Sequence, residues 1–144
     1  MAIVERSILI QASPTAIDQI ALDASRLSEW YVGVEDARPD SRYPEVDSQV
    51  VLVYKAAGVT FNLALIVQDI VHGDHIRYQM TGMMMGTQDW TYTREGDSTR
   101  LTAQVEYEMP GGVLGKIADK LVVERLNVKN LEQSLENLKV LAEG

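Results

Sequence analysis

The chain has 144 residues, of which 46% are hydrophobic, a formal net charge of −8 at pH 7 and no cysteine. This length suffices for one hydrophobic core, so we expect a single domain over residues 1–144. The absence of cysteine excludes a disulfide framework and thiolate chemistry. The acidic balance and the scattered basic residues argue against nucleic acid and anionic membranes as partners, because both require clustered Lys and Arg.

The start of the sequence does not have the pattern of a signal peptide. Glu5 and Arg6 follow a short apolar start, where a signal peptide has a basic segment and then an apolar run. No segment approaches the roughly twenty apolar residues of a membrane span. We therefore expect a cytoplasmic protein without stable membrane insertion.

The first elements are one strand and two short helices. Residues 3–11 alternate in polarity and contain β-branched side chains, which predicts a strand. Ser13 and Pro14 are typical of a helix start, because Ser caps the helix and Pro fits its first position. A second short helix follows, with Ser25 as its cap. Its buried side consists of Leu27 and Trp30.

The middle of the chain predicts an antiparallel sheet. Residues 32–49 are polar and contain two prolines, which is typical of an edge strand and a loop. The strands that follow are expected at 50–56, 59–71, 75–81, 87–94 and 99–109. The last of them alternates strictly, which predicts one buried face and one wet face. Arg77 and Asp89 on neighbouring strands predict a cross-strand salt bridge.

The C-terminal segment predicts a helix of about thirty residues. It opens after the turn Pro110-Gly111-Gly112 and extends to Leu141. Such a helix needs a large apolar surface to cover its stripe, and the strands can supply one. Residues of the stripe recur one heptad apart: Leu114, Leu121, Val128, Leu135 and Ala142. The order of elements therefore predicts an α+β fold.

These patterns together resemble a known superfamily. Ser7–Ile10 with Ala12–Pro14 is similar to its first strand and helix start, and Leu27–Trp30 to its helix ending in Trp. Residues 110–116 and 131–139 are similar to its glycine turn and final helix. The chain thus resembles the START-related helix-grip superfamily, within it the polyketide cyclase/dehydratase and lipid-transport-like (SRPBCC) branch.

The resemblance implies a helix-grip fold. In such a fold a curved antiparallel sheet of about six or seven strands wraps around a long C-terminal helix, and two short helices follow the first strand. The sequence departs from the family at Ile17-Asp18, where relatives often carry a large aromatic residue. We therefore expect a differently shaped roof over the interior.

The family likeness favours binding of a hydrophobic or amphipathic small molecule between sheet and helix. Ligand pockets are mainly apolar and aromatic with a few placed polar groups. The alternative, that these side chains fill a solid core, stays open. The candidate ligand-binding residues are Trp30, Phe61, Leu63, Tyr78, Met80, Met84, Trp90, Tyr92, Val105, Tyr107, Leu114, Ile117, Ala118 and Leu121.

The second hypothesis is a polyketide cyclase/dehydratase-like enzyme acting on an aromatic or polyketide-type substrate. Its candidate acid or base is Glu124, a carboxylate on the apolar side of the last helix. The alternative is an ordinary ion pair with a neighbouring basic residue. His72 and His75 flank a hairpin turn without further ligands nearby, so we expect no metal and no cofactor.

A third hypothesis concerns self-association. The last helix carries more apolar residues near Val122, Val123 and Leu126 than one stripe requires. If these side chains are exposed, they form a patch through which two copies can pair. A homodimer is therefore a further expectation beside the small-molecule ligand.

Overall fold

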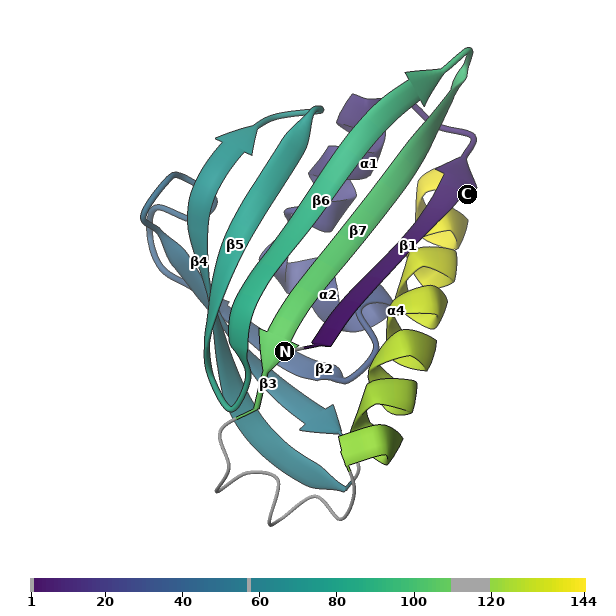
Figure 1. The fold of residues 1–144 in the computed structure, drawn as a ribbon. Helices are drawn as coiled ribbons and strands as arrows, with labels where there is room; N and C mark the ends of the chain where they lie inside the picture. Colours follow the sequence, from purple (N-terminus) through teal and green to yellow (C-terminus); the bar gives the residue numbers. More distant parts are fainter. Residues whose placement is uncertain (1, 57, 110–119) are drawn as a thin grey trace.

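The computed structural model describes residues 2–56, 58–109 and 120–144, with side chains from residue 123 onward in the last segment. Its elements confirm the predicted α+β helix-grip fold (Figure 1). In chain order they are β1 (Ala2–Ile10), α1 (Pro14–Ala21), η1 (Ala24–Arg26), α2 (Leu27–Trp30), β2 (Val34–Pro39), β3 (Gln49–Ala56), β4 (Val59–Val71), β5 (His75–Gly82), β6 (Met85–Glu95), β7 (Ser98–Glu108) and α4 (Lys120–Glu143).

The strands form one seven-stranded antiparallel sheet in the order β1-β7-β6-β5-β4-β3-β2. Consecutive strands from β2 to β7 are neighbours, as their short connections require. β1 adds to β7 at one end, and β2 with Pro39 forms the predicted edge strand at the other. Figure 1 shows the curved sheet with α1 and α2 on its concave side and α4 running beside β1.

The two helix starts illustrate one correct and one wrong cap prediction. Ser13 Oγ accepts a hydrogen bond from the backbone N of Ala16 at 3.2 Å, as predicted. The cap of the second helical segment is Asp23 rather than Ser25. Asp23 Oδ1 accepts from the backbone N of Ser25 at 3.0 Å and from its hydroxyl at 2.6 Å. A carboxylate can accept both bonds at once, which explains why Asp takes the cap position.

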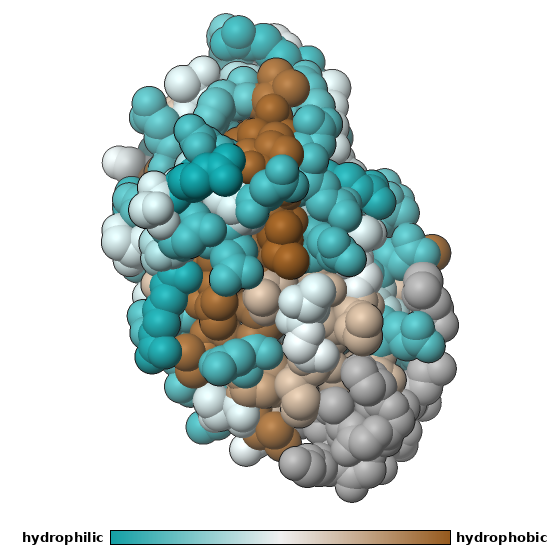
Figure 2. Space-filling model, turned by 90° about the vertical axis from the view of Figure 1, so that its left-hand side faces the viewer, coloured by the Kyte–Doolittle hydropathy of each residue, from teal (hydrophilic) through white to brown (hydrophobic). Residues whose placement is uncertain are grey.

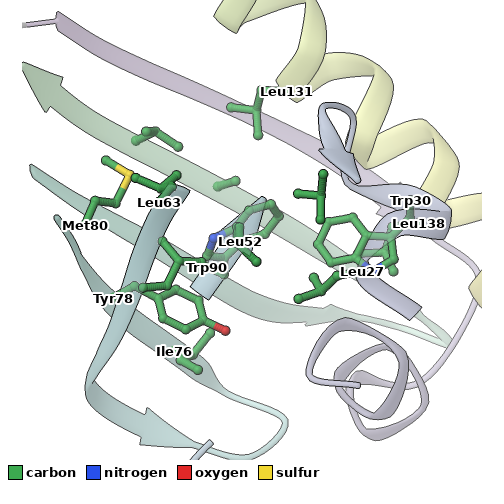
Figure 3. Packing of buried hydrophobic residues seen from close by; sticks show 14 of the residues in the cluster. Leu27, Trp30, Leu52, Leu63, Ile76, Tyr78, Met80, Trp90, Leu131 and Leu138 are labelled. Atoms are coloured by element: carbon green, nitrogen blue, oxygen red, sulfur yellow. The ribbon is translucent and has the colours of Figure 1, made fainter. Parts of the chain in front are cut away.

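The core lies between the concave face of the sheet and the helices. The predicted alternation of β7 is confirmed, with its residues from Leu101 to Tyr107 buried at every second position. β4 buries every second residue from Phe61 as far as Val67, where a bulge shifts the register. In Figure 3, Trp90 and Tyr78 extend from the sheet between these apolar residues, and Leu131 and Leu138 approach from α4.

The face of α4 that meets the fold is only partly the predicted apolar stripe. Leu135 is buried, but Val128 and Ala142 are half-buried. Polar side chains share the inner side of the helix. The buried Ser134 Oγ accepts from the backbone N of Val32 at 2.9 Å, and Asn137 Nδ2 donates to the carbonyl of Trp30 at 3.2 Å. Hydrogen bonds from α4 therefore hold the junction between α2 and β2.

Two surface predictions have opposite outcomes. The salt bridge between Arg77 and Asp89 is confirmed, with Arg77 Nη1 3.0 and 2.8 Å from the two carboxylate oxygens. The exposed patch expected around Val123 is wrong for that residue, because Val123 is buried against Val59, Met83 and Met109. Figure 2, which views the side of the molecule nearest β4, shows a hydrophilic upper part crossed by a narrow apolar band and a lower part with a broader apolar area.

Of the helices in the described part of the chain, none combines the length and the apolar character that a membrane crossing requires.

Candidate ligand-binding site

Two small cavities lie between the sheet and the helices. The first has a volume of about 20 Å³ and is bordered by α1, α2, β4, β5 and β6. The second has a volume of about 30 Å³ and is bordered by β1, β3, β6, β7 and α4. Each has room for about one or two water molecules. Tyr31 and Gln88 belong to the wall of both.

Aromatic residues dominate both walls. The chain has six tyrosines and two tryptophans, and every one of them lines at least one cavity. The first cavity has Trp30, Tyr31, Tyr43, Tyr78, Trp90 and Tyr92; the second has Tyr31, Tyr54 and Tyr107. The rest of the two walls is aliphatic or amide, and no described residue that lines either cavity carries a charge. This composition is that of an uncharged pocket with hydrogen-bonding tips.

Gln88 is the centre of the hydrogen bonding between the cavities. Only 1% of it is exposed. Its Nε2 donates to the hydroxyl of Tyr31 at 3.0 Å and to the sulfur of Met80 at 3.2 Å. Its Oε1 accepts from Nε1 of Trp90 at 3.0 Å. Because both ends of the amide are bonded, its orientation is fixed.

A second polar pair lies on the first cavity. The hydroxyl groups of Tyr43 and Tyr78 are 2.7 Å apart and share a hydrogen bond. Burial raises the pKa of Tyr43 to about 12. Burial also raises the pKa of Tyr31, Tyr78 and Tyr92. These phenols therefore stay protonated at neutral pH and serve as neutral hydrogen-bonding groups.

Three buried polar atoms have no hydrogen-bond partner within the described part of the chain: Trp30 Nε1, Tyr107 Oη and Asn127 Nδ2. All three belong to residues that line the cavities. Trp30 lines the first, and Tyr107 and Asn127 line the second. A buried polar group without a partner costs about 1–3 kcal/mol. Such atoms therefore favour a water molecule or a ligand that brings the missing partner.

The structure divides the predicted ligand-binding residues into groups. Trp30, Tyr78, Trp90 and Tyr92 meet at the first cavity, and Met84, Val105 and Tyr107 at the second. Phe61, Leu63 and Met80 are buried in the core but line neither cavity. Leu114, Ile117 and Ala118 lie outside the described residues, as does the side chain of Leu121.

Several wall residues were missed by the sequence analysis. Tyr31 and Tyr43 lie outside the longer helices and strands, where no periodicity assigns an inward side. Gln88 left a usable signal, because the alternation that turns Trp90 inward also turns Gln88 inward. The sequence also contained a signal for Asn127 and Asn130. They lie seven and four residues before the buried Ser134, which places them on the same face of the helix.

Glu124, the candidate acid or base, lines neither cavity. It is half-buried and borders an open groove on the surface of α4 beside Arg125, Lys129 and Glu132. Its role as an acid or base stays a prediction.

The two histidines take part in carboxylate contacts around the turn between β4 and β5. His72 Nδ1 is 2.9 Å from Oδ2 of Asp18, a buried residue of α1. His75 lies between Asp74 and Asp69, at 2.6 and 2.7 Å. Hydrogen bonds to these two carboxylates, first to Asp74, raise the pKa of His75. Among the described residues, no three His, Asp or Glu side chains are arranged to hold a metal ion.

A curved antiparallel sheet, closed by a C-terminal helix over an uncharged aromatic interior, defines a protein of the helix-grip class. Residues 1–143 match the family model described as polyketide cyclase / dehydrase and lipid transport. The chain belongs to this family. No functionally curated protein matches the sequence.

Solved structures share the fold over nearly the whole chain. A START superfamily protein from Mycobacterium smegmatis has 20% identity and a TM-score of 0.77, covering 98% of this chain and 97% of the other. The Zhui aromatase/cyclase from Streptomyces has 15% identity and a TM-score of 0.78, covering 99% and 93%. The protein TTHA0849 from Thermus thermophilus has 22% identity and a TM-score of 0.82, covering 98% and 97%.

Proposed function

We propose that the protein binds a hydrophobic or amphipathic small molecule between the sheet and α4. The observation that carries the proposal is the placement of the unpartnered atoms of Trp30, Tyr107 and Asn127 on the walls of two uncharged cavities. Affinity comes from apolar burial, at about 25 cal/mol per Å² removed from water. Orientation comes from the tyrosine, tryptophan and amide tips.

Binding requires the cavities to enlarge, because about 20 and 30 Å³ hold only water-sized molecules. We expect the ligand to select a conformation in which the cavities are larger than in this structure. The methionines near the second cavity suit such a change, since thioether side chains adapt to irregular space. Met84 lines this cavity and Met83 packs against the same core.

The test is native mass spectrometry of protein purified from its own host, followed by melting measurements on stripped protein. We expect a co-purified small molecule, a lower melting temperature after its removal, and recovery when it is added back. Unchanged melting across a broad set of lipids and aromatic compounds, with no co-purified molecule, contradicts the proposal.

A polyketide cyclase/dehydratase-like activity is the second candidate, favoured by the buried Asp18 beside His72. A cyclase needs a base that removes a proton from a carbon between two carbonyls. Burial raises the pKa of Tyr92, a residue of the first cavity, and the negative charge of Asp18 raises it further. The Asp18 carboxylate therefore acts close to this cavity. We expect turnover of a β-polyketone to fall at least tenfold in Asp18→Asn, and the same measurement on Glu124→Gln tests the acid or base predicted from the sequence. Absence of turnover in the unmodified protein rejects this candidate.

A further inference from the structure

The two cavities are separated by a wall one side chain thick. Tyr31 and Gln88 line both, and the bond from Gln88 Nε2 to the Tyr31 hydroxyl, 3.0 Å long, joins them. If either side chain moves aside, the two cavities become one longer pocket.

Of the two side chains that form this wall, Tyr31 is the one that can move. Gln88 is almost fully buried and bonded to three residues. Tyr31 keeps part of its surface exposed, and its buried hydroxyl receives one hydrogen bond, from Gln88. Its ring meets those of Trp30, Trp90 and Tyr54 at centroid distances of 5.4, 6.1 and 6.4 Å. A planar aromatic ligand can replace these ring contacts. Its oxygen can accept the hydrogen bond that Gln88 Nε2 otherwise donates to the Tyr31 hydroxyl.

The ends of the joined pocket have defined hydrogen-bonding needs. At the first cavity Trp30 Nε1 is a donor only, so the ligand must bring an acceptor oxygen. At the second cavity Asn127 Nδ2 is a donor, and Tyr107 Oη can donate or accept. One ligand oxygen at the first cavity therefore supplies a partner that Trp30 Nε1 lacks within the described residues. A second oxygen at the other end can take over the weak contact between the Tyr107 phenol and the Asn127 amide.

The walls also select on charge. No described residue lining either cavity is ionic, so a carboxylate or phosphate placed there loses its hydration without a counter-ion. The site therefore disfavours fatty-acid anions and phospholipid headgroups.

We propose that Tyr31 is a displaceable partition, and that its displacement joins the two cavities into one site for a neutral, elongated aromatic molecule with a hydroxyl or carbonyl oxygen at each end. This inference rests on the proposed small-molecule binding and names the ligand class.

The experiment measures calorimetric affinity for four probes of graded size and charge. They are phenol, biphenyl with one para hydroxyl, biphenyl with a hydroxyl at both para ends, and biphenyl with a carboxylate at both para ends. We expect the dihydroxy probe to bind about tenfold more tightly than the monohydroxy probe, from the added hydrogen bonds. We expect the dicarboxylate to bind at least about a hundredfold more weakly.

Variants at Tyr31 test the partition. Tyr31→Ala removes the ring that must be displaced, so the dihydroxy probe should bind about tenfold more tightly than to the unmodified protein. Tyr31→Phe keeps the ring and removes the bond to Gln88, and should give a gain of about threefold while preserving the fold. The matched control is Ile10→Val, a fully buried core position on β1 that lines neither cavity and should leave probe affinity unchanged.

The outcomes separate this inference from the proposed function. The inference is overturned if the monohydroxy and dihydroxy biphenyls bind equally well, or if the dicarboxylate binds as tightly as the dihydroxy probe. It is also overturned if neither Tyr31→Ala nor Tyr31→Phe binds the dihydroxy probe more tightly than the unmodified protein does. Phenol binding alone then still supports a small-molecule site. If no probe and no co-purified molecule binds any variant, the proposed function and this inference fall together.

Discussion

At the scale of single residues, the difference between a paired and an unpaired buried hydroxyl matters most. Tyr43 and Tyr78 satisfy each other at 2.7 Å, whereas the hydroxyl of Tyr107 has no partner in the described structure. Loss of the hydroxyl oxygen should therefore change the free energy of unfolding differently at Tyr43 and at Tyr107, although both residues lie in the same interior.

Tyr107→Phe should leave the free energy of unfolding of the ligand-free protein unchanged or slightly higher, because it removes an unpaired polar atom. Tyr43→Phe should lower it by about 1 kcal/mol, because Tyr78 loses its partner. Urea unfolding of both variants measures the difference. Equal destabilisation would show that the Tyr107 hydroxyl is already satisfied.

His75 gives the protein a pH-dependent contribution to stability. Its folded pKa is raised, first by the hydrogen bond to Asp74, above an unfolded value of about 6.5. The contribution is therefore complete below about pH 6.5 and disappears as the pH rises through the folded pKa.

The unmodified protein should accordingly have a higher free energy of unfolding than His75→Gln. This difference should be largest near about pH 6 and shrink at higher pH. Urea unfolding at a series of pH values checks this. A difference that grows as the pH rises contradicts the assigned contacts with Asp74 and Asp69.

At the scale of elements, sequence periodicity predicted which faces of the regular strands are buried. The alternation of β7 and the apolar face of β4 were predictable because one side of each strand meets the core. The helix start at Ser13 was predictable from local chemistry. Tyr31 and Tyr43 could not be placed this way, because their inward direction follows from how α2 and the loop before β3 pack on the sheet.

The polar side of α4 is an element-scale feature with its own test. Ser134→Ala removes the acceptor for the backbone N of Val32 and should destabilise the protein by about 1–2 kcal/mol. Glu136→Ala, an exposed change on the same helix, should stay within about 0.5 kcal/mol. Thermal melting compares the two. Equal stability of both variants contradicts a fastening role for Ser134.

Gly86 allows β6 to approach β7. Its φ is +150°, and a Cβ there would lie 1.9 Å from the carbonyl oxygen of Glu106. Gly86→Ala should therefore destabilise the protein by at least about 2 kcal/mol. Gly96→Ala is the control, because a Cβ at that hairpin meets no atom within 4 Å and only its positive φ is strained. A smaller loss in Gly86→Ala than in Gly96→Ala contradicts this reading.

At the scale of the whole molecule, one continuous core runs from Val4 in β1 to Leu138 in α4. This continuity supports our proposal that residues 1–144 form a single domain. The family likeness predicted the arrangement around this core. It could not predict how far the cavities are filled, because small changes in side-chain packing decide whether an interior holds a ligand or a water molecule.

The pairing of β1 with β7 also sets an order of events during synthesis. Ala2 lies opposite Tyr107, and Arg6 Nε contacts Glu132 at 3.0 Å, so β1 depends on residues that are synthesised long after it. Until those arrive, the apolar side chains of β1 have no neighbouring strand to cover them. The sheet therefore closes at this end only after β7 has been synthesised, and until then the nascent chain passes through a stage that favours protection by chaperones.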